Sequence, residues 1–196
     1  MRSAPQYILL AIVAGLFAAG TAFSADKYVI DPEHSSIGFS VMHLGVNKVK
    51  GKFNVFSGVI MADEKNLANC SVEVKIKVDS VDTNNEGVDT HLKTADFFDA
   101  KKFPVLTFKS KQVKKAKSGY TATGTLIMHG VSKEISIPFT FEKAVDPSQK
   151  SRIGIDAGFS INRQDYGLKW NSLMDNGGLI VGNDVKIELA VGAVKE

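Results

Sequence analysis

The side chains that could support metal or proton-transfer chemistry are few. The chain has four histidines and one cysteine, Cys70. Imidazole binds metal ions and exchanges protons near neutral pH. One hypothesis is therefore an exported metal-dependent or other enzyme that uses some of these histidines with nearby acids: His34, His43, His91 and His129.

The spacing of these histidines favours structural roles instead. None lies in a close metal-ligand pair, and Cys70 has no second cysteine to join it. His34 follows Asp31 in a turn, where a hydrogen bond would fix the start of a strand. The sequence contains neither Gly-x-Ser-x-Gly nor His-Glu-x-x-His. We therefore expect no catalytic residue, no metal and no cofactor, and keep the enzyme as the alternative.

The elements that position these residues are mainly strands. Apolar and polar residues alternate with period two, which is typical of strands with one buried face. Shorter runs bring the expected total to about eight or nine strands. Such strands bury their apolar faces in a sandwich or in a closed barrel. Eight barrel strands leave an interior that side chains just fill or that holds one slender ligand. The clearest runs are 37–41, 72–78, 135–141, 153–161 and 185–191.

One segment breaks this alternation. Residues 84–95 place apolar side chains at helical spacing, with Thr83 or Asn84 as a plausible N-cap. Phe97 and Phe98 follow directly. The pattern predicts a short helical insertion between two strands, with two aromatic rings at its exit.

The first residues predict export. Arg2 is the one charged residue ahead of an apolar run at 7–19, and small residues follow up to Ser24. This pattern is typical of a secretory signal peptide, and the apolar run is short for a membrane span of about 20 residues. We expect a signal peptide at 1–24, cleaved near Ser24, and a periplasmic protein. A retained membrane anchor is the alternative.

Residues 25–196 are long enough for one domain with a sizeable core. They contain no internal repeat or linker. The formal net charge of the whole chain, +3, is too small to suggest nucleic acid as a partner. With one cysteine there is no internal disulfide. The core alone must hold this domain together.

Separate motifs follow one another along residues 25–196. They are YVIDPEHS at 28–35, IGFSVMHLG at 37–45, VKGKF at 49–53, DTHL at 89–92, DFFD at 96–99, GTL at 124–126, HGV at 129–131 and INR at 161–163. Their order and residues resemble the YceI family. The resemblance implies a lipocalin-like antiparallel barrel that carries a polyisoprenoid or similar amphiphile in an apolar pore. It also implies a periplasmic or secreted location and a possible homodimer.

A pore of this kind would be lined by the apolar strand faces, although the same residues also suit a solid core. The expected lining is Phe39, Val41, Phe53, Val72, Val74, Ile76, Leu126, Met128, Phe139, Ile155 and Phe159. The expected rim or headgroup residues are Met42, His43, Phe97, Phe98, Arg163, Leu168 and Trp170. For Arg163, an ion pair with Asp165 is favoured over contact with a lipid phosphate. Cys70 is in phase with Val72 and is expected to point inward.

A cluster of lysines crowds one predicted hairpin that ends at Ser118-Gly119. We expect a solvated turn that limits strand pairing. Transient docking on an anionic lipid surface is the functional alternative. The lysines are Lys109, Lys111, Lys114, Lys115 and Lys117.

Overall fold

The computed structural model describes residues 25–173 and 178–196. The predicted signal peptide at 1–24 lies outside the described residues. Within the described part, no helix is both long and apolar enough to cross a membrane.

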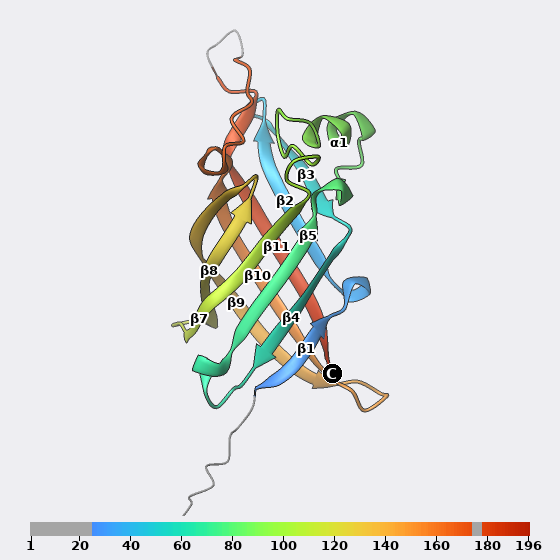
Figure 1. The fold of residues 1–196 in the computed structure, drawn as a ribbon, viewed down its shortest axis with the longest axis vertical. Helices are drawn as coiled ribbons and strands as arrows, with labels where there is room; N and C mark the ends of the chain where they lie inside the picture. Colours follow the sequence, from blue (N-terminus) through green and yellow to red (C-terminus); the bar gives the residue numbers. More distant parts are fainter. Residues whose placement is uncertain (1–24, 174–177) are drawn as a thin grey trace, which may run out of the picture.

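The described residues form an elongated antiparallel barrel with one α-helix at one end (Figure 1). All strands join one sheet that closes through pairing of β1 with β11. The strands are β1 (Asp26–Ile30), β2 (Ser36–His43), β3 (Asn47–Phe53), β4 (Phe56–Ala62), β5 (Ser71–Lys77), β6 (Val81–Asp82), β7 (Val105–Lys115), β8 (Tyr120–Met128), β9 (Val131–Val145), β10 (Ser151–Asn162) and β11 (Val181–Lys195).

These eleven strands correspond to eight barrel strands, three of which are broken. β11 pairs with β2 through its first residues and with β1 through its last. β1 and β2 are therefore two halves of one barrel strand, interrupted by a 3-10 turn at Pro32–His34. β3 and β4 form the next barrel strand, and β5 and β6 the third. The closed barrel of about eight strands is confirmed.

The inward residues follow the predicted alternation. Phe39 on β2 lies opposite Ile187 on one neighbouring strand and Gly51 on the other. A Cβ atom at Gly51 would lie 2.4 Å from the Phe39 ring. Glycine at this position therefore lets the ring lie across β3.

The two ends of the barrel differ in structure. We call the end with the helix the helical end; it also carries the β2–β3 turn and a 3-10 turn at Arg163–Tyr166. The opposite end, with the β4–β5, β7–β8 and β9–β10 turns, is the hairpin end (Figure 1). The N-terminal strand and the C-terminus lie at the hairpin end.

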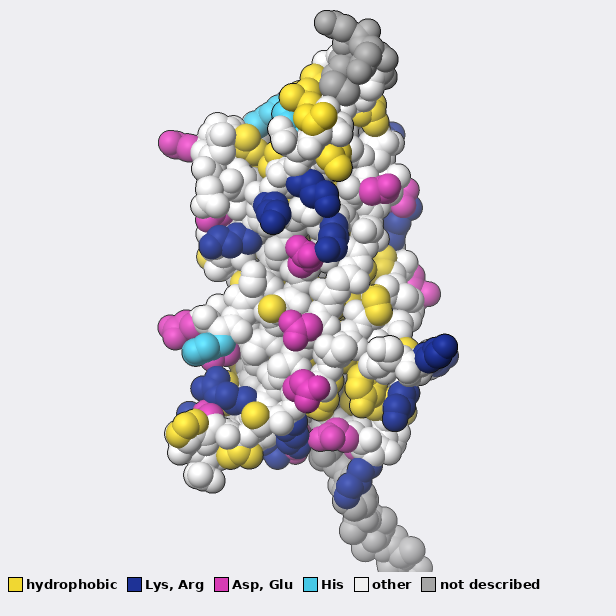
Figure 2. Space-filling model, turned by 180° about the vertical axis from the view of Figure 1, so that it is seen from behind, with side chains coloured by type: hydrophobic (Ala, Val, Ile, Leu, Met, Phe, Trp, Pro, Cys, Tyr) yellow, Lys and Arg dark blue, Asp and Glu magenta, His cyan; other side chains and the backbone are white. Residues whose placement is uncertain are grey.

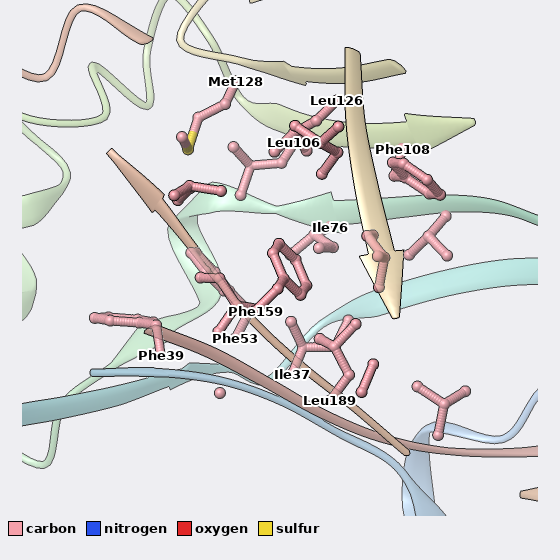
Figure 3. Close-up of a pocket in the computed structure, with 18 of the residues that line it drawn as sticks. Ile37, Phe39, Phe53, Ile76, Leu106, Phe108, Leu126, Met128, Phe159 and Leu189 are labelled. Carbon is pink, nitrogen blue, oxygen red and sulfur yellow. The ribbon is translucent and has the colours of Figure 1, made fainter. Parts of the chain in front are cut away.

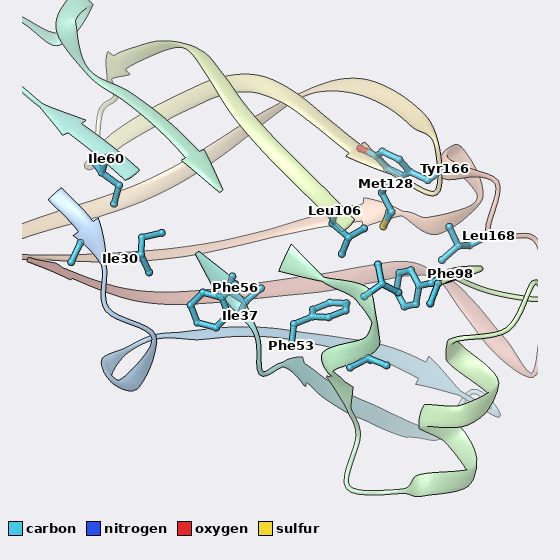
Figure 4. Packing of buried hydrophobic residues seen from close by; sticks show 14 of the residues in the cluster. Ile30, Ile37, Phe53, Phe56, Ile60, Phe98, Leu106, Met128, Tyr166 and Leu168 are labelled. Atoms are coloured by element: carbon cyan, nitrogen blue, oxygen red, sulfur yellow. The ribbon is translucent and has the colours of Figure 1, made fainter. Parts of the chain in front are cut away.

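Buried side chains form one cluster that extends along the barrel (Figure 4). At the helical end the Phe53 and Phe98 rings meet edge to face, 5.8 Å apart, beside Leu168. Toward the hairpin end, Tyr28 and Ile153 are almost fully buried. Many of these residues also line a cavity along the barrel axis, described below.

The helical insertion is shorter than predicted. Helix α1 spans Glu86–Leu92, and its N-cap is Asn85, whose side chain accepts a hydrogen bond from the Val88 amide at 3.2 Å. The expected cap residues were wrong because Thr83 bonds Asp89 instead, at 2.6 Å between Oγ1 and Oδ1, and Asn84 adopts a positive φ of 58°.

Candidate ligand-binding site

A cavity of about 670 Å³ extends along the barrel axis. Its volume falls within the roughly 300–1,000 Å³ that is usual for small-molecule sites. Figure 3 shows Phe39, Phe53 and Phe159 directed into the same space as Leu126 and Met128. The predicted pore residues all line it: Phe39, Val41, Phe53, Val72, Val74, Ile76, Leu126, Met128, Phe139, Ile155 and Phe159.

Further lining residues lie in the predicted strands but outside the predicted set. Leu106, Phe108, Ile135, Ile187 and Leu189 also face the cavity. The same alternation that identified their neighbours could have found them, because each lies an even number of residues from another inward residue in its strand.

Polar lining residues are confined to the ends of the cavity. Between them the wall is aliphatic and aromatic. At the helical end the polar or titratable groups are His43, Asn85, His91 and Arg163. At the hairpin end they are Asp63, Glu64, Cys70, Ser71 and Tyr120. An apolar centre with polar ends suits a long molecule with one polar group.

Three rings cover the cavity at the helical end. His91 meets Phe97 and Trp170 edge to face, with ring centroids 4.9 and 5.0 Å apart, and the Phe97 and Trp170 centroids are 5.2 Å apart. His91 Nε2 lies 2.9 Å from Asp96 Oδ2, which fixes the orientation of the imidazole. Helix α1 thus supplies one ring, and the segments after α1 and after β10 supply the other two.

Arg163 follows β10 directly and is buried, with 4% of its surface exposed. It accordingly does not form the expected ion pair with Asp165, which instead lies near Lys133 at 3.6 Å. The Arg163 guanidinium donates hydrogen bonds to one side-chain oxygen, that of Asn183, and otherwise to backbone carbonyls. The carbonyl acceptors are those of Leu168, Trp170, Val181 and Gly182, at 2.7–3.2 Å.

These contacts have two consequences for the helical end. Arg163 binds the returning segment 168–183 to the end of β10. Its charge also has no carboxylate partner among the residues described, and burial lowers its pKa from the usual value. All five N–H groups of Arg163 already donate to acceptors within the protein, so the property it contributes to the cavity is its positive charge.

The other predicted rim residues lie in different environments. His43, Phe97, Phe98, Leu168 and Trp170 line the cavity at the helical end. Met42 does not: it lies on the outer face of β2, 38% exposed. Its neighbour His43 faces inward, and adjacent residues in a strand face opposite sides of the sheet.

Polar contacts cross the hairpin end. Lys143 Nζ donates to Glu64 Oε1 at 3.3 Å, which joins β9 to the β4–β5 turn. The Tyr28 hydroxyl lies 3.2 Å from Ser151 Oγ. Cys70 lines the cavity as predicted, with its sulfur 3.2 Å from the Asp63 amide.

The remaining histidines make structural contacts. His34 Nδ1 lies 2.9 Å from Asp31 Oδ2, which confirms the predicted bond in that turn. His129 Nδ1 lies 3.1 Å from the Tyr166 carbonyl, and its ring packs on Phe103. In the described ranges, no three His, Cys, Asp or Glu side chains form a group that could hold a metal ion.

The lysine-rich hairpin is partly paired. Lys109 lies 3.5 Å from Glu73, and Lys111 lies 2.8 Å from Glu134. Both pairs are exposed cross-strand contacts, so they reduce the positive charge of the hairpin without adding much stability.

Comparison with known proteins places this geometry in a family. The family model described as the YceI-like domain matches residues 28–193. A UPF0312 protein of Yersinia enterocolitica is 39% identical over 162 residues, which cover 81% of this chain and 84% of that protein. A UPF0312 protein of Pseudomonas aeruginosa is 36% identical over 190 residues, covering 95% of this chain and 96% of that protein.

Solved structures share the barrel. A YCEI protein from Campylobacter jejuni has a TM-score of 0.68 and 33% identity, covering 79% of this chain and 90% of that one. BcnA from Burkholderia cenocepacia has a TM-score of 0.72 at 24% identity, covering 83% and 98%. A domain from Saccharophagus degradans, described as polyisoprenoid binding, has a TM-score of 0.63 at 17% identity and covers 88% and 100%. The last two likenesses establish the fold alone.

Proposed function

This chain belongs to the YceI-like family, and we propose that it is a periplasmic carrier that holds a polyisoprenoid or similar long-chain amphiphile in its barrel. The observation that carries the proposal is the cavity with an apolar centre and polar ends. The mechanism is removal of the apolar tail from water, with no covalent step.

Burial of the tail supplies the binding energy. Each buried methylene contributes about 0.8 kcal/mol, so a chain of about fifteen carbons gains on the order of 12 kcal/mol before the cost of ordering it. The aliphatic and aromatic wall would not distinguish one apolar tail from another. Tight binding therefore requires no catalytic group.

The headgroup belongs at the helical end in this proposal. The Arg163 charge lies there without a carboxylate partner in the described chain, whereas Asp63 and Glu64 line the hairpin end. The positive charge of Arg163 attracts an anionic headgroup to the helical end, and the carboxylates at the hairpin end repel it. Both effects favour an anionic or strongly dipolar headgroup beside Arg163. The tail then extends toward β4 and β5.

Two further observations support the ligand class and the location. The Saccharophagus degradans domain is described as polyisoprenoid binding and has the same fold. The sequence at 1–24 has the pattern of a secretory signal peptide. A carrier of this kind would move or sequester its cargo in the aqueous periplasm.

Native mass spectrometry of the purified mature protein, followed by organic extraction, tests the proposal. We expect a mass above that of the polypeptide and an extracted amphiphile with a long apolar chain. The same spectrum gives the mass of the assembly and so tests the predicted homodimer. N-terminal mass analysis tests cleavage near Ser24.

A matched pair of variants assigns the cargo to the cavity. Ala157 lines the cavity from β10, and Ser160 on the same strand is exposed. We expect Ala157→Phe to lose most of the bound amphiphile because its ring occupies part of the space, whereas Ser160→Phe keeps it. Equal cargo in both folded variants, or none in the wild type after reconstitution with a polyisoprenoid, would contradict the proposal.

A further inference from the structure

Aliphatic side chains are exposed side by side on two loops at the helical end. Val46 and Leu44 belong to the β2–β3 turn and are 77% and 41% exposed. Leu173 and Leu179 belong to the segment before β11 and are 68% and 39% exposed. We call these four residues the apolar tip. Water-exposed aliphatic side chains in a group usually mark an interaction surface.

The two loops of the apolar tip are joined by backbone hydrogen bonding. The Leu44 amide donates to the Ile180 carbonyl at 2.8 Å, and Leu173 and Leu179 face each other in an antiparallel bridge. Arg163 fixes the base of the same segment through the Leu168, Trp170, Val181 and Gly182 carbonyls. The tip is therefore held in place, so little conformational entropy is lost from these two loops when the tip docks.

The apolar tip adjoins the end of the cavity. His43, one residue before Leu44, lines the cavity, and so do Trp170 and Val181 on the other loop. A surface that covers the tip therefore lies next to this end of the cavity.

Lysines lie on the outer barrel face below the apolar tip. Lys48 follows Val46 by two residues, and Lys50 and Lys186 are both in register with Ser40 on β2. Lys186 Nζ donates to Glu188 Oε1 at 2.6 Å, and this hydrogen bond, with the charges of Lys186, Lys50 and Lys48, lowers the pKa of the Glu188 carboxyl. Figure 2 shows Lys and Arg side chains gathered on this face directly below the apolar residues at the top of the molecule. Basic side chains next to exposed aliphatic ones suit a surface that has an apolar interior and anionic headgroups.

We propose that the protein docks its helical end on an anionic phospholipid membrane, with the apolar tip entering the headgroup layer and Lys48, Lys50 and Lys186 facing the lipid phosphates. The inference rests on the proposed carrier function and identifies the membrane as the place where the cargo is collected or delivered. Docking there would let an amphiphile pass between bilayer and cavity beneath the His91, Phe97 and Trp170 rings.

A second copy of the chain fits the apolar tip less well. A stable protein interface buries about 800 Å² on each partner and uses about 20–30 residues a side. The tip offers four described aliphatic side chains on two narrow turns. A lipid bilayer is fluid, so it can surround these four side chains without having a surface of matching shape.

The lysine-rich hairpin at the opposite end lacks the apolar component. Lys114, Lys115 and Lys117 are exposed there, but no group of exposed aliphatic residues is described beside them. Val145 is the most exposed aliphatic residue described on a strand at that end, at 63%. It therefore provides a matched control for Val46.

Co-sedimentation of the mature protein with vesicles tests the proposal, using phosphatidylcholine alone and phosphatidylcholine with phosphatidylglycerol. We expect binding to the anionic vesicles that weakens as salt is raised. The double variant Val46→Asp/Leu173→Asp should bind at least tenfold more weakly, whereas Val145→Asp should bind like the wild type. Melting curves confirm that all variants fold, and a second pair, Val46→Ser and Val145→Ser, repeats the comparison without added charge.

The lysines provide an independent measurement. Each Lys→Gln change at Lys48 or Lys50 should weaken binding to the anionic vesicles about fivefold, because a lysine near an anionic surface contributes about that factor. The same changes at Lys114 and Lys117 should have no effect. Lysine changes that matter only at the hairpin would place docking at the wrong end and overturn the proposal.

Other outcomes separate this inference from the proposed function. Absence of wild-type binding to either vesicle, or equal loss in the Val46 and Val145 variants, overturns the docking proposal while leaving the carrier intact. A dimer that becomes a monomer when the tip is changed, with vesicle binding retained, also overturns it. Specific vesicle binding by a protein that never takes up an amphiphile would leave the docking inference standing and remove the carrier.

Discussion

The two ends of the barrel each use one arginine to hold loops in place, in opposite ways. At the helical end Arg163 is 4% exposed and its guanidinium bonds one side-chain amide and four backbone carbonyls, all uncharged. At the hairpin end Arg152 bonds the carboxylates of Asp31 and Asp146 at 3.0 and 2.7 Å, with a side chain 36% exposed. One end neutralises its arginine, and the other keeps a positive charge beside the cavity.

This difference shows that the role of an arginine depends on its hydrogen-bond acceptors. Carboxylate acceptors suit a stabilising role, and neutral acceptors leave its charge available for binding. Carboxylates at the hairpin end cancel the charge where water screens it. Neutral acceptors at the helical end satisfy the donors but leave the field of the cation intact, and burial reduces its screening. The polar end that is proposed to meet a headgroup is therefore the one whose cation lacks a carboxylate partner.

The largest expected effect comes from exchanging each arginine for leucine. Arg163→Leu should lower the free energy of unfolding by about 3 kcal/mol or more, because several buried carbonyls lose their donor. Arg152→Leu should cost clearly less, since water replaces its exposed contacts. Urea unfolding measures both. Trp170 is the one tryptophan of the chain, so its fluorescence should change in Arg163→Leu and stay constant in Arg152→Leu; the opposite ranking would reverse the comparison.

A second comparison uses the two most buried tyrosines. The Tyr28 hydroxyl contacts Ser151 at the hairpin end, whereas the buried Tyr166 hydroxyl at the helical end has no hydrogen-bond partner among the described side chains and backbone. We expect Tyr28→Phe to cost about 1 kcal/mol and Tyr166→Phe to be neutral or stabilising. Thermal melts of the two variants decide this, and a larger loss in Tyr166→Phe would show that its hydroxyl is used.

A third comparison uses pH. The pKa of Asp31 is lowered chiefly by its hydrogen bond with His34 and then by Arg152; the pKa of Asp146 is lowered by Ser148 and Arg152. A carboxyl with a lowered folded-state pKa stabilises the protein above its unfolded pKa of about 3.9, and this stability is lost as pH falls through the folded value. Asp146→Asn should therefore melt below the wild type at neutral pH, and the difference should shrink below about pH 4.

The control for that titration is Asp184→Asn. Asp184 is exposed on β11 toward the helical end and forms no salt bridge with the described residues. Its substitution should leave the melting temperature nearly constant across the same pH range. A difference for Asp146→Asn that persists undiminished at low pH would show that the amide disturbs packing instead of removing an ionic contact.

The smallest effect is expected in the lysine-rich hairpin. Lys111→Gln removes the exposed contact with Glu134 and should change the free energy of unfolding by less than about 0.5 kcal/mol. The same bound applies to Lys114→Gln. Urea unfolding of the two variants should give curves that overlap within error. A clear loss for Lys111→Gln alone would show that this cross-strand pair is stronger than its exposure suggests.

The sequence predicted the barrel and its wall because both follow from alternation. Phe39 and Val41 recur every second residue, so one buried position determines the orientation of the others. Met42 was placed at the rim beside His43, yet two neighbours on a strand cannot both face inward. Applying the alternation strictly would have moved Met42 to the outside.

The contacts at the helical end were less accessible to sequence reasoning. Arg163 extends the inward row of β10, but its acceptors come from a segment that returns from 168–183. Proximity in sequence suggested Asp165 instead. Val46 and Leu173 come together because the loops next to β2 and β11 meet. A contact between loops so distant in sequence cannot be predicted from a local sequence pattern.

Closure of the barrel by its first and last strands has a consequence for the order of folding. β1 pairs with β11, and Tyr28 lies opposite Lys195, so the sheet joins residues from the two extremes of the domain. Contacts this distant in sequence form slowly because a long loop must close first. A nascent chain therefore cannot close the barrel before β11 has been synthesised, because β1 has no other partner among the described strands on that side of the sheet.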